Sequence, residues 1–447
     1  MFGSLVAVVL AGSVAASCSG SDTDSGGDAA TTVSESVPVA STAAEPSTTV
    51  APATNPPVTT DVIDAAPTTD APLATDAAPS TDAGTSLDDV VPTAGNGGGT
   101  APETGASPEQ GGDYSAVEPI VQAFVDERGL NGAGLVVVER DAGVVYEHHW
   151  GEFTPDRISL VASSSKMITA GVLLRLSDDG LLDMDAPVAD AVEWGGGNPD
   201  ITPAQLVSNS SGLVGLLPNP GYAPYVCQYV ASGTLQDCAA QIFTSPDDDG
   251  DIVAPDTEFR YGGAQWQVAG AVAEAVSGRS WAELIDEIYV QPCGLDALGY
   301  NNHFTQIGSG GFAYPTEFAG DPETLMATDN PNMEGGAFVT TGDYAKLLLM
   351  HLRGGTCGDE RVLSQGALDT LHADRTGTVY GSDTGYGMGW WVDRATGRIS
   401  DAGAYGSVPW LDLEDGYGAF LVVEADAVTG GELAAQLYDI VESAATA

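Results

Sequence analysis

The sequence predicts an α/β protein in which an antiparallel sheet, built from both chain ends, is flanked by the terminal helices and an inserted, mainly helical lobe. Three observations predict this fold. A helical pattern at 116–128 precedes two strand-like runs at 133–150, a second strand pair and a closing helix occupy 401–445, and helical patterns with Gly/Pro-rich loops dominate the chain between them.

The N-terminal elements follow from the spacing of apolar residues. Residues 116–128 (AVEPIVQAFVDER) place Val117, Ile120, Val121 and Phe124 on one helical face. The next run, AGLVVVERDAGVVYEHHW, is typical of two strands joined by an Asp-Ala-Gly turn. We therefore expect a helix followed by a hairpin.

The C-terminal elements mirror this order. Residues 401–425 predict two strands around the turn at Glu414-Asp415-Gly416, and 430–445 (GGELAAQLYDIVESAA) predict an amphipathic helix. Between the two ends, residues 385–393 (GYGMGWWVD) form a strand-like insertion among the helical patterns. Both ends thus supply strands and a helix to one layer, and we predict a single folded domain over 115–447.

The first quarter of the chain differs from the rest. Residues 1–18 form a short apolar run, too short for a transmembrane helix and typical of an export signal. Cys18 after small residues resembles a lipoprotein signal, with ordinary secretion or a chance cysteine as alternatives. Residues 19–114 are rich in Thr, Ser, Ala, Pro and Asp and predict a disordered acidic tether. We therefore expect an extracytoplasmic protein, either membrane-anchored or secreted.

The chain is strongly acidic, with a formal net charge of −50. All 13 basic residues and 48 of the 63 acidic ones lie after residue 114, so the predicted domain is itself acidic. This charge argues against a nucleic-acid partner and against adhesion to anionic lipids. Membrane contact is expected only through a lipid on Cys18. A solvated acidic surface or the recruitment of cationic substrates would explain the charge.

Besides Cys18 there are four cysteines, an even number that favours disulfides in an exported chain. Of the three pairings, we prefer Cys227–Cys238 with Cys293–Cys357, because each pair would restrain a loop-rich stretch. The histidines are scattered, and no spacing predicts a metal site or a cofactor.

The segment SLVASSSKMITAGVLLRLSDDG predicts a strand or loop followed by a buried helix. Ser163 and Lys166 lie one turn apart on the same face of its start, so the amine is within reach of the hydroxyl. A serine needs a base to become a nucleophile, and a lysine serves near neutral pH only when burial lowers its usual pKa of about 10.4. Arginine could not replace it, because it stays protonated. Alone, Ser-x-x-Lys is also typical of a serine-capped helix with a surface lysine.

The order of motifs resembles the serine β-lactamase and penicillin-binding superfamily, in particular its class C-like and esterase branch. The resemblance covers the chain from Ala116 onward and rests on 161–192, ITPAQLVSNSSGL, FRYGGAQWQVAGAVAEAVSGRSW, VQPCGL, MEGGAFVTTGDYAKLLLMHLRGG and DAGAYGSVPW. It implies that Ser163 is acylated, that Lys166 takes its proton and that Tyr261 relays protons to the leaving group. It also implies an oxyanion hole made by the N–H groups of Ser163 and Ala404. Beside a lysine, Tyr261 is expected to exist partly as phenolate.

Two positions depart from the superfamily's motifs. Gly263 stands where Tyr-x-Asn carries its amide, and Asp401-Ala402-Gly403 replaces Lys-Thr-Gly or His-x-Gly. We expect Gly263, Asp401 and Gly403 to line the substrate, with no cation to bind a substrate carboxylate and with Gly403 allowing close approach. Asn209 stands where many relatives carry histidine, and four tryptophans line a pocket or fill the core (Trp266, Trp390, Trp391 and Trp410).

These features predict an exported serine hydrolase that forms an acyl-enzyme on Ser163 and acts on an ester or amide without a recognised carboxylate. The expected partner is a small-molecule or cell-envelope acyl substrate. The alternatives are a β-lactamase or D-alanyl-D-alanine carboxypeptidase-type enzyme, and a non-catalytic cell-envelope binding or penicillin-sensing module.

Overall fold

The computed structural model describes residues 112–217, 219, 221–246, 250–307 and 312–447. The predicted export signal, the lipidation site at Cys18 and the predicted tether as far as residue 111 lie outside these residues. Tyr114, placed in the tether by the sequence analysis, is buried and stacks on Tyr146 with 5.1 Å between ring centroids. None of the described helices is both long and apolar enough to cross a membrane.

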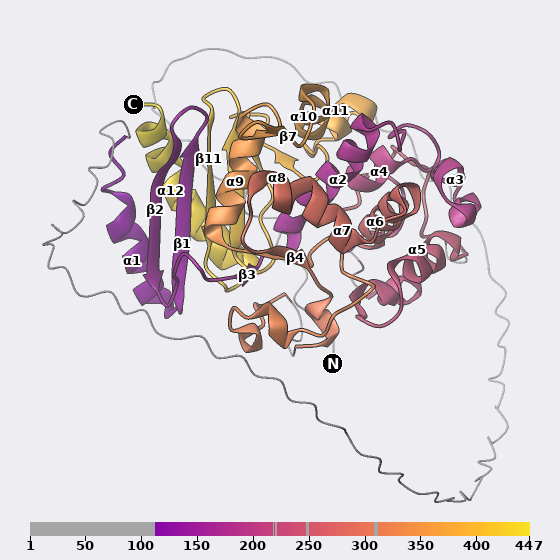
Figure 1. Ribbon diagram of the computed structural model, residues 1–447, viewed down its shortest axis with the longest axis horizontal. Helices are drawn as coiled ribbons and strands as arrows, with labels where there is room; N and C mark the ends of the chain where they lie inside the picture. The colour runs from indigo at the N-terminus through magenta and orange to yellow at the C-terminus, as the bar shows by residue number, and fades with distance from the viewer. Residues whose placement is uncertain (1–111, 218, 220, 247–249, 308–311) are drawn as a thin grey trace, which may run out of the picture. The chain divides into compact units, whose positions relative to one another are not determined.

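A six-stranded antiparallel sheet joins the two ends of the folded domain, in the order β2-β1-β11-β10-β9-β8 (Figure 1). The predicted N-terminal hairpin pairs with the predicted C-terminal one, and Val136 lies opposite Phe420. This arrangement confirms the sheet built from both chain ends. Its strands are β1 (Gly132–Glu139), β2 (Gly143–Gly151), β8 (Trp391–Val392), β9 (Ile399–Ser400), β10 (Ser407–Asp412) and β11 (Tyr417–Val422).

Helices cover both faces of this sheet. On one face Leu135 and Val137 of β1 belong to a core shared with α1 (Val117–Arg128) and α12 (Ala427–Ala445). On the other face α9 (Thr341–Leu352) packs against β1 and β11, and alternate β1 residues join the core of the helical lobe. Because both faces are buried, β1 is a continuous apolar run rather than an alternating one.

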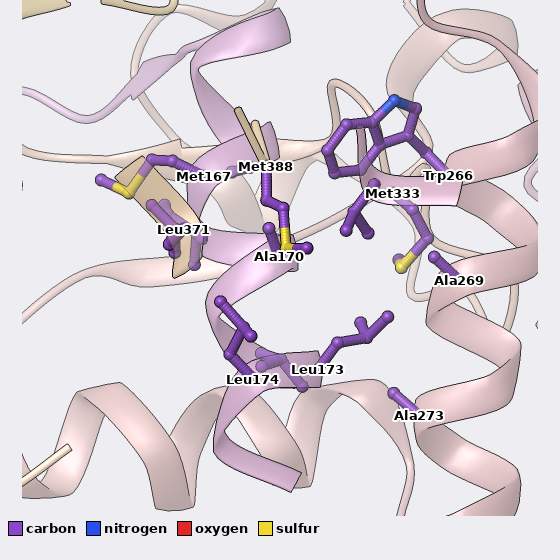
Figure 2. Close-up of a cluster of buried hydrophobic side chains, with 14 of the residues drawn as sticks. Met167, Ala170, Leu173, Leu174, Trp266, Ala269, Ala273, Met333, Leu371 and Met388 are labelled. Carbon is purple, nitrogen blue, oxygen red and sulfur yellow. The ribbon is translucent and has the colours of Figure 1, made fainter. Parts of the chain in front are cut away.

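The helical lobe is built around α2 (Lys166–Asp178) and α6 (Ala264–Ser277). Figure 2 shows Ala170 and Leu173 of α2 in one cluster with Trp266 and Ala269 of α6. The contacts on several sides explain why α2 is apolar almost all round. The other helices are α3 (Val188–Ala191), α4 (Pro203–Val207), α5 (Leu235–Thr244), α7 (Trp281–Ile285), α8 (Gln291–Cys293), α10 (Gln365–His372) and α11 (Arg375–Tyr380).

A small three-stranded sheet leads the chain into α2. Its order is β3-β5-β4, formed by β3 (Ser159–Leu160), β4 (Leu298–Tyr300) and β5 (Ala337–Val339). After β3 a 3-10 turn spans Ala162–Ser165, and Ala162 adopts φ 45°, which L-residues rarely do. The strand-to-helix junction therefore turns sharply where the serine cluster lies.

Two disulfides are present, Cys227–Cys238 and Cys293–Cys357, which are the preferred pairs. The second also borders β6 (Thr356–Cys357), which pairs with β7 (Glu360–Arg361).

Removing the two disulfides is expected to destabilise the domain unequally. The Cys227–Cys238 bond spans 11 residues and the Cys293–Cys357 bond spans 64. Loop-closure entropy then predicts losses of about 3 and about 4 kcal/mol for the respective double alanine variants. Urea unfolding of both variants and the parent measures this order. A larger loss from the shorter loop would contradict an entropic origin.

Candidate active site

Ser163 lies on the 3-10 turn, and Lys166 begins α2 directly after it. The Lys166 Nζ donates a hydrogen bond of 3.0 Å to the Ser163 Oγ. Ser163 is half-buried, whereas the Lys166 side chain is 0% exposed. The structure thus places the amine against the hydroxyl and shields it from bulk water.

Two further contacts fix the Lys166 amine. Nζ donates to the backbone oxygen of Glu334 at 2.9 Å and lies 3.6 Å from the carboxylate Oε2 of the same residue. Nζ also lies 4.8 Å from the centroid of the Tyr261 ring and 5.8 Å from that of Trp266. The lysine is therefore held between an acid, a carbonyl and two aromatic faces.

Tyr261 lies just before α6 and faces the same pocket. Its ring stacks on Trp391 at 5.0 Å, and its hydroxyl points to the Asp401 Oδ1 at 3.5 Å. Burial and the Asp401 charge hold the pKa of Tyr261 well above its usual range, although a hydrogen bond with Ser163 favours the phenolate. These surroundings favour the neutral phenol over the partly ionised form that was expected, and the sequence did not show that Asp401 lies beside Tyr261.

Asp401 precedes β10 and is fully buried. Burial raises the pKa of its carboxyl well above the usual range, while Lys166 and the Tyr261 hydroxyl favour the charged form. Its Oδ2 has no hydrogen-bond partner among the described residues. Asp401, which we predicted to line the substrate, has a fully buried side chain that accepts a hydrogen bond from the Tyr261 hydroxyl.

The two predicted substrate-lining glycines are also buried. A Cβ on Gly403 would lie 2.1 Å from the Val161 carbonyl oxygen, so this glycine allows the chain before β10 to approach the serine turn rather than a substrate. The Gly263 N–H donates to the Glu334 Oε2 at 2.6 Å. Both glycines therefore make close contacts within the protein at the positions that we predicted to line the substrate.

Hydrogen bonds join the serine turn to the segment before β10. The Ser164 Oγ donates to the Asp401 backbone oxygen at 2.7 Å, and the Ser407 Oγ donates to the Val161 oxygen at 2.7 Å. These contacts bring together the two segments that carry Ser163 and Ala404. Among the described residues, the N–H groups of Ser163 and Ala404 have no acceptor, as donors for an oxyanion require.

Glu334 was not among the predicted site residues, although it lies in the run MEGGAFVTTGDYAKLLLMHLRGG. The signal was an acid directly before Gly335-Gly336, in a run that is otherwise apolar or small at its start. Of the four tryptophans, only Trp391 is half-exposed and lies beside Tyr261, whereas the others are core residues (Trp266, Trp390 and Trp410).

Asn209 has a structural position. Its Oδ1 accepts hydrogen bonds from the Gly262 N–H at 3.1 Å and from the Trp266 Nε1 at 2.9 Å. It thereby holds the segment that carries Tyr261 against the loop after α4. Gln265 also donates to the same oxygen.

Two histidines pair with each other in the core. The His351 Nδ1 and the His372 Nε2 are 2.9 Å apart, and burial lowers the pKa of His372 to about 4. The described part of the chain contains no group of three or more His, Cys, Asp or Glu that could hold a metal ion.

Comparisons with known proteins agree on one family and fold. The Beta-lactamase family pattern matches residues 117–441. Penicillin-binding protein 4 from Amycolatopsis lactamdurans is 25% identical over 356 residues, covering 73% of this chain and 87% of that protein. A structure of a candidate beta-lactamase from Bacteroides dorei is 26% identical with a TM-score of 0.59, covering 74% of this chain and 99% of the other.

A third likeness concerns the fold alone. EstCE1, a hydrolase with promiscuous acyltransferase activity, has a TM-score of 0.59 at 20% identity and covers 74% of this chain and 98% of its own. These structural likenesses confirm the predicted fold class.

Proposed function

This chain belongs to the beta-lactamase family of serine hydrolases, and from that premise we propose that it cleaves uncharged or cationic esters or amides through an acyl-enzyme on Ser163. The observation that carries the proposal is the 3.0 Å contact between the Lys166 Nζ and the Ser163 Oγ, made by a lysine side chain that is fully buried. A hydroxyl with an adjacent amine is an activated nucleophile.

Each group then has a distinct role. The Ser163 Oγ attacks the substrate carbonyl as Lys166 takes its proton, and the N–H groups of Ser163 and Ala404 hold the oxyanion. Tyr261, which its surroundings keep protonated, passes a proton to the leaving group. Water then attacks the acyl carbon as its proton passes to Lys166, the same donors hold the second oxyanion, and that proton returns to the Ser163 Oγ as the bond between Oγ and the acyl carbon breaks.

The substrate class follows from the charges around the pocket. Asp401 occupies the place where a cation is expected, and Glu334 adds a second acid beside Lys166. An acid stands where the motif carries a cation, and Lys166 is already paired with Glu334, so the described residues at this position offer no unpaired cation to a substrate carboxylate. This favours an acyl compound without a carboxylate over a penicillin. The two disulfides support an exported protein, because such bonds persist in oxidising compartments.

A substrate panel tests the proposal. We expect turnover of p-nitrophenyl esters, slow or no turnover of a carboxylate-bearing chromogenic cephalosporin, and fluorophosphonate labelling at Ser163. Faster turnover of the cephalosporin than of the esters would favour the β-lactamase alternative. Labelling by a fluorescent penicillin without turnover of either compound would favour a sensing module.

A further inference from the structure

The carboxylate of Glu334 occupies a space that two glycines leave open. Its Oε2 accepts the Gly263 N–H at 2.6 Å, and a Cβ on Gly262 would lie 2.6 Å from the same oxygen. Both glycines have positive φ, 68° and 81°. A side chain at position 262 would meet the Glu334 carboxylate, so Gly262 leaves the space that this carboxylate occupies, and the Gly263 N–H holds it there.

The same carboxylate faces the amine of Lys166. Oε2 lies 3.6 Å from Nζ, and the side chains of the pair are 7% and 0% exposed. The backbone of Glu334 is fixed as well, because its oxygen accepts from Nζ and the following Gly335 N–H donates to the Asn332 Oδ1 at 2.8 Å. The carboxylate therefore has a defined place beside the amine.

The charged and titratable groups that face Glu334 among the described residues come from several elements. They are Lys166 at the start of α2, Asp401 before β10, Tyr229 in the 3-10 turn Ala223–Tyr229, Tyr261 before α6 and Tyr386 before β8. Lys166 is the one cation in this set. Its Nζ donates to the Ser163 Oγ and lies beside the Glu334 carboxylate, so a proton must leave Nζ before the amine can take one from Ser163.

We propose that Glu334 is a positioning residue that acts through Lys166 by accepting its proton, and this inference rests on the proposed function. The carboxylate rotates to close the 3.6 Å gap, and one proton passes from Nζ to Oε2, leaving a neutral amine and a neutral acid. The Ser163 Oγ then forms its bond to the substrate carbon as its proton moves to Nζ. Lys166 is again ammonium, and this proton leaves through Tyr261 to the departing group. Once Lys166 has given up that proton through Tyr261 to the leaving group, Glu334 returns its own proton to the Lys166 amine.

Phosphonylation of Ser163 by a fluorophosphonate isolates this step. An Oγ–P bond forms, the P–F bond breaks, fluoride leaves without a proton, and the Oγ proton moves to Nζ. The rate constant is measured against pH for the parent and for Glu334→Gln, which keeps the shape and an acceptor for the Gly263 N–H. Glu274→Gln is the matched control, because that partly buried carboxylate accepts the Trp281 N–H at the far end of α6.

We expect Glu334→Gln to slow phosphonylation by about 10²-fold at neutral pH. The acidic limb of the variant's pH–rate profile should move to higher pH, because Lys166 must then lose its proton to water rather than to the carboxylate. Glu334→Asp should recover part of the phosphonylation rate and show the same pH dependence as the parent. Glu274→Gln should keep both the rate and the pH–rate profile of the parent. Should Glu334→Gln fail to fold, Glu334→Asp and a Glu334→Ala variant assayed with added acetate carry the same test.

Two results would overturn the inference. In the first, the parent is labelled, but Glu334→Gln is phosphonylated as fast as the parent or faster, and its pH–rate profile does not move. This would show that Glu334 only pairs with the ammonium. A parent that is never labelled at Ser163 would overturn the proposed function, and this inference with it.

Discussion

Replacing Ser163 by alanine is expected to lower kcat for p-nitrophenyl esters by about 10⁴-fold or more, because the nucleophile of the acyl-enzyme is lost. The fold should survive, since the Ser163 side chain is half-buried and its hydroxyl contacts only groups of the pocket. Stopped-flow kinetics measures the rate of acylation, and intact-protein mass spectrometry measures whether the covalent adduct forms.

Ser245→Ala is the matched control for this experiment. Its hydroxyl donates to the Gln241 backbone oxygen at the end of α5 and lies outside the pocket. We expect it to retain labelling and turnover. Equal ester cleavage by Ser163→Ala and the parent would refute the nucleophile assignment.

The sheet could be predicted because local signals mark its strands. The apolar run of β1 and the turn at Glu414-Asp415-Gly416 are visible in the sequence, and the structure has both hairpins. The strand predicted at 385–393 is shorter, because only Trp391–Val392 pair as β8. Gly389 explains part of this, since a Cβ there would lie 2.8 Å from the Lys166 carbonyl and the chain must pass close to α2.

From the residues alone, the site was predictable only where its residues are neighbours in the chain, whereas Tyr261 and Ala404 were added by the resemblance. Ser163 and Lys166 are three residues apart, so a helical turn brings them together whatever the rest of the chain does. The pairing of Lys166 with Glu334 depends on the return of a distant segment, and so does the contact of Asp401 with the Tyr261 hydroxyl. No local pattern contains that information, which is why the phenolate expectation did not account for the acid beside Tyr261.

Replacing Lys166 is expected to remove activity and stability together, unlike the serine variant. Lys166→Met keeps the length of the side chain but supplies no base, so turnover should fall by about 10³-fold or more. It also leaves the Glu334 carboxylate buried without its cation, which should cost about 3–5 kcal/mol. Urea unfolding and ester turnover measure the two losses on one sample.

The double variant Lys166→Met/Glu334→Gln separates these two contributions. A neutral amide beside a thioether leaves no unpaired charge, so most of the lost stability should return while turnover stays at the level of Lys166→Met. Lys166→Arg gives the complementary result, because its cation pairs with Glu334 but stays protonated and cannot act as a base. Recovered turnover in either variant would show that Lys166 serves only to hold the pocket together, and the base would then have to be sought among Tyr261 and Asp401.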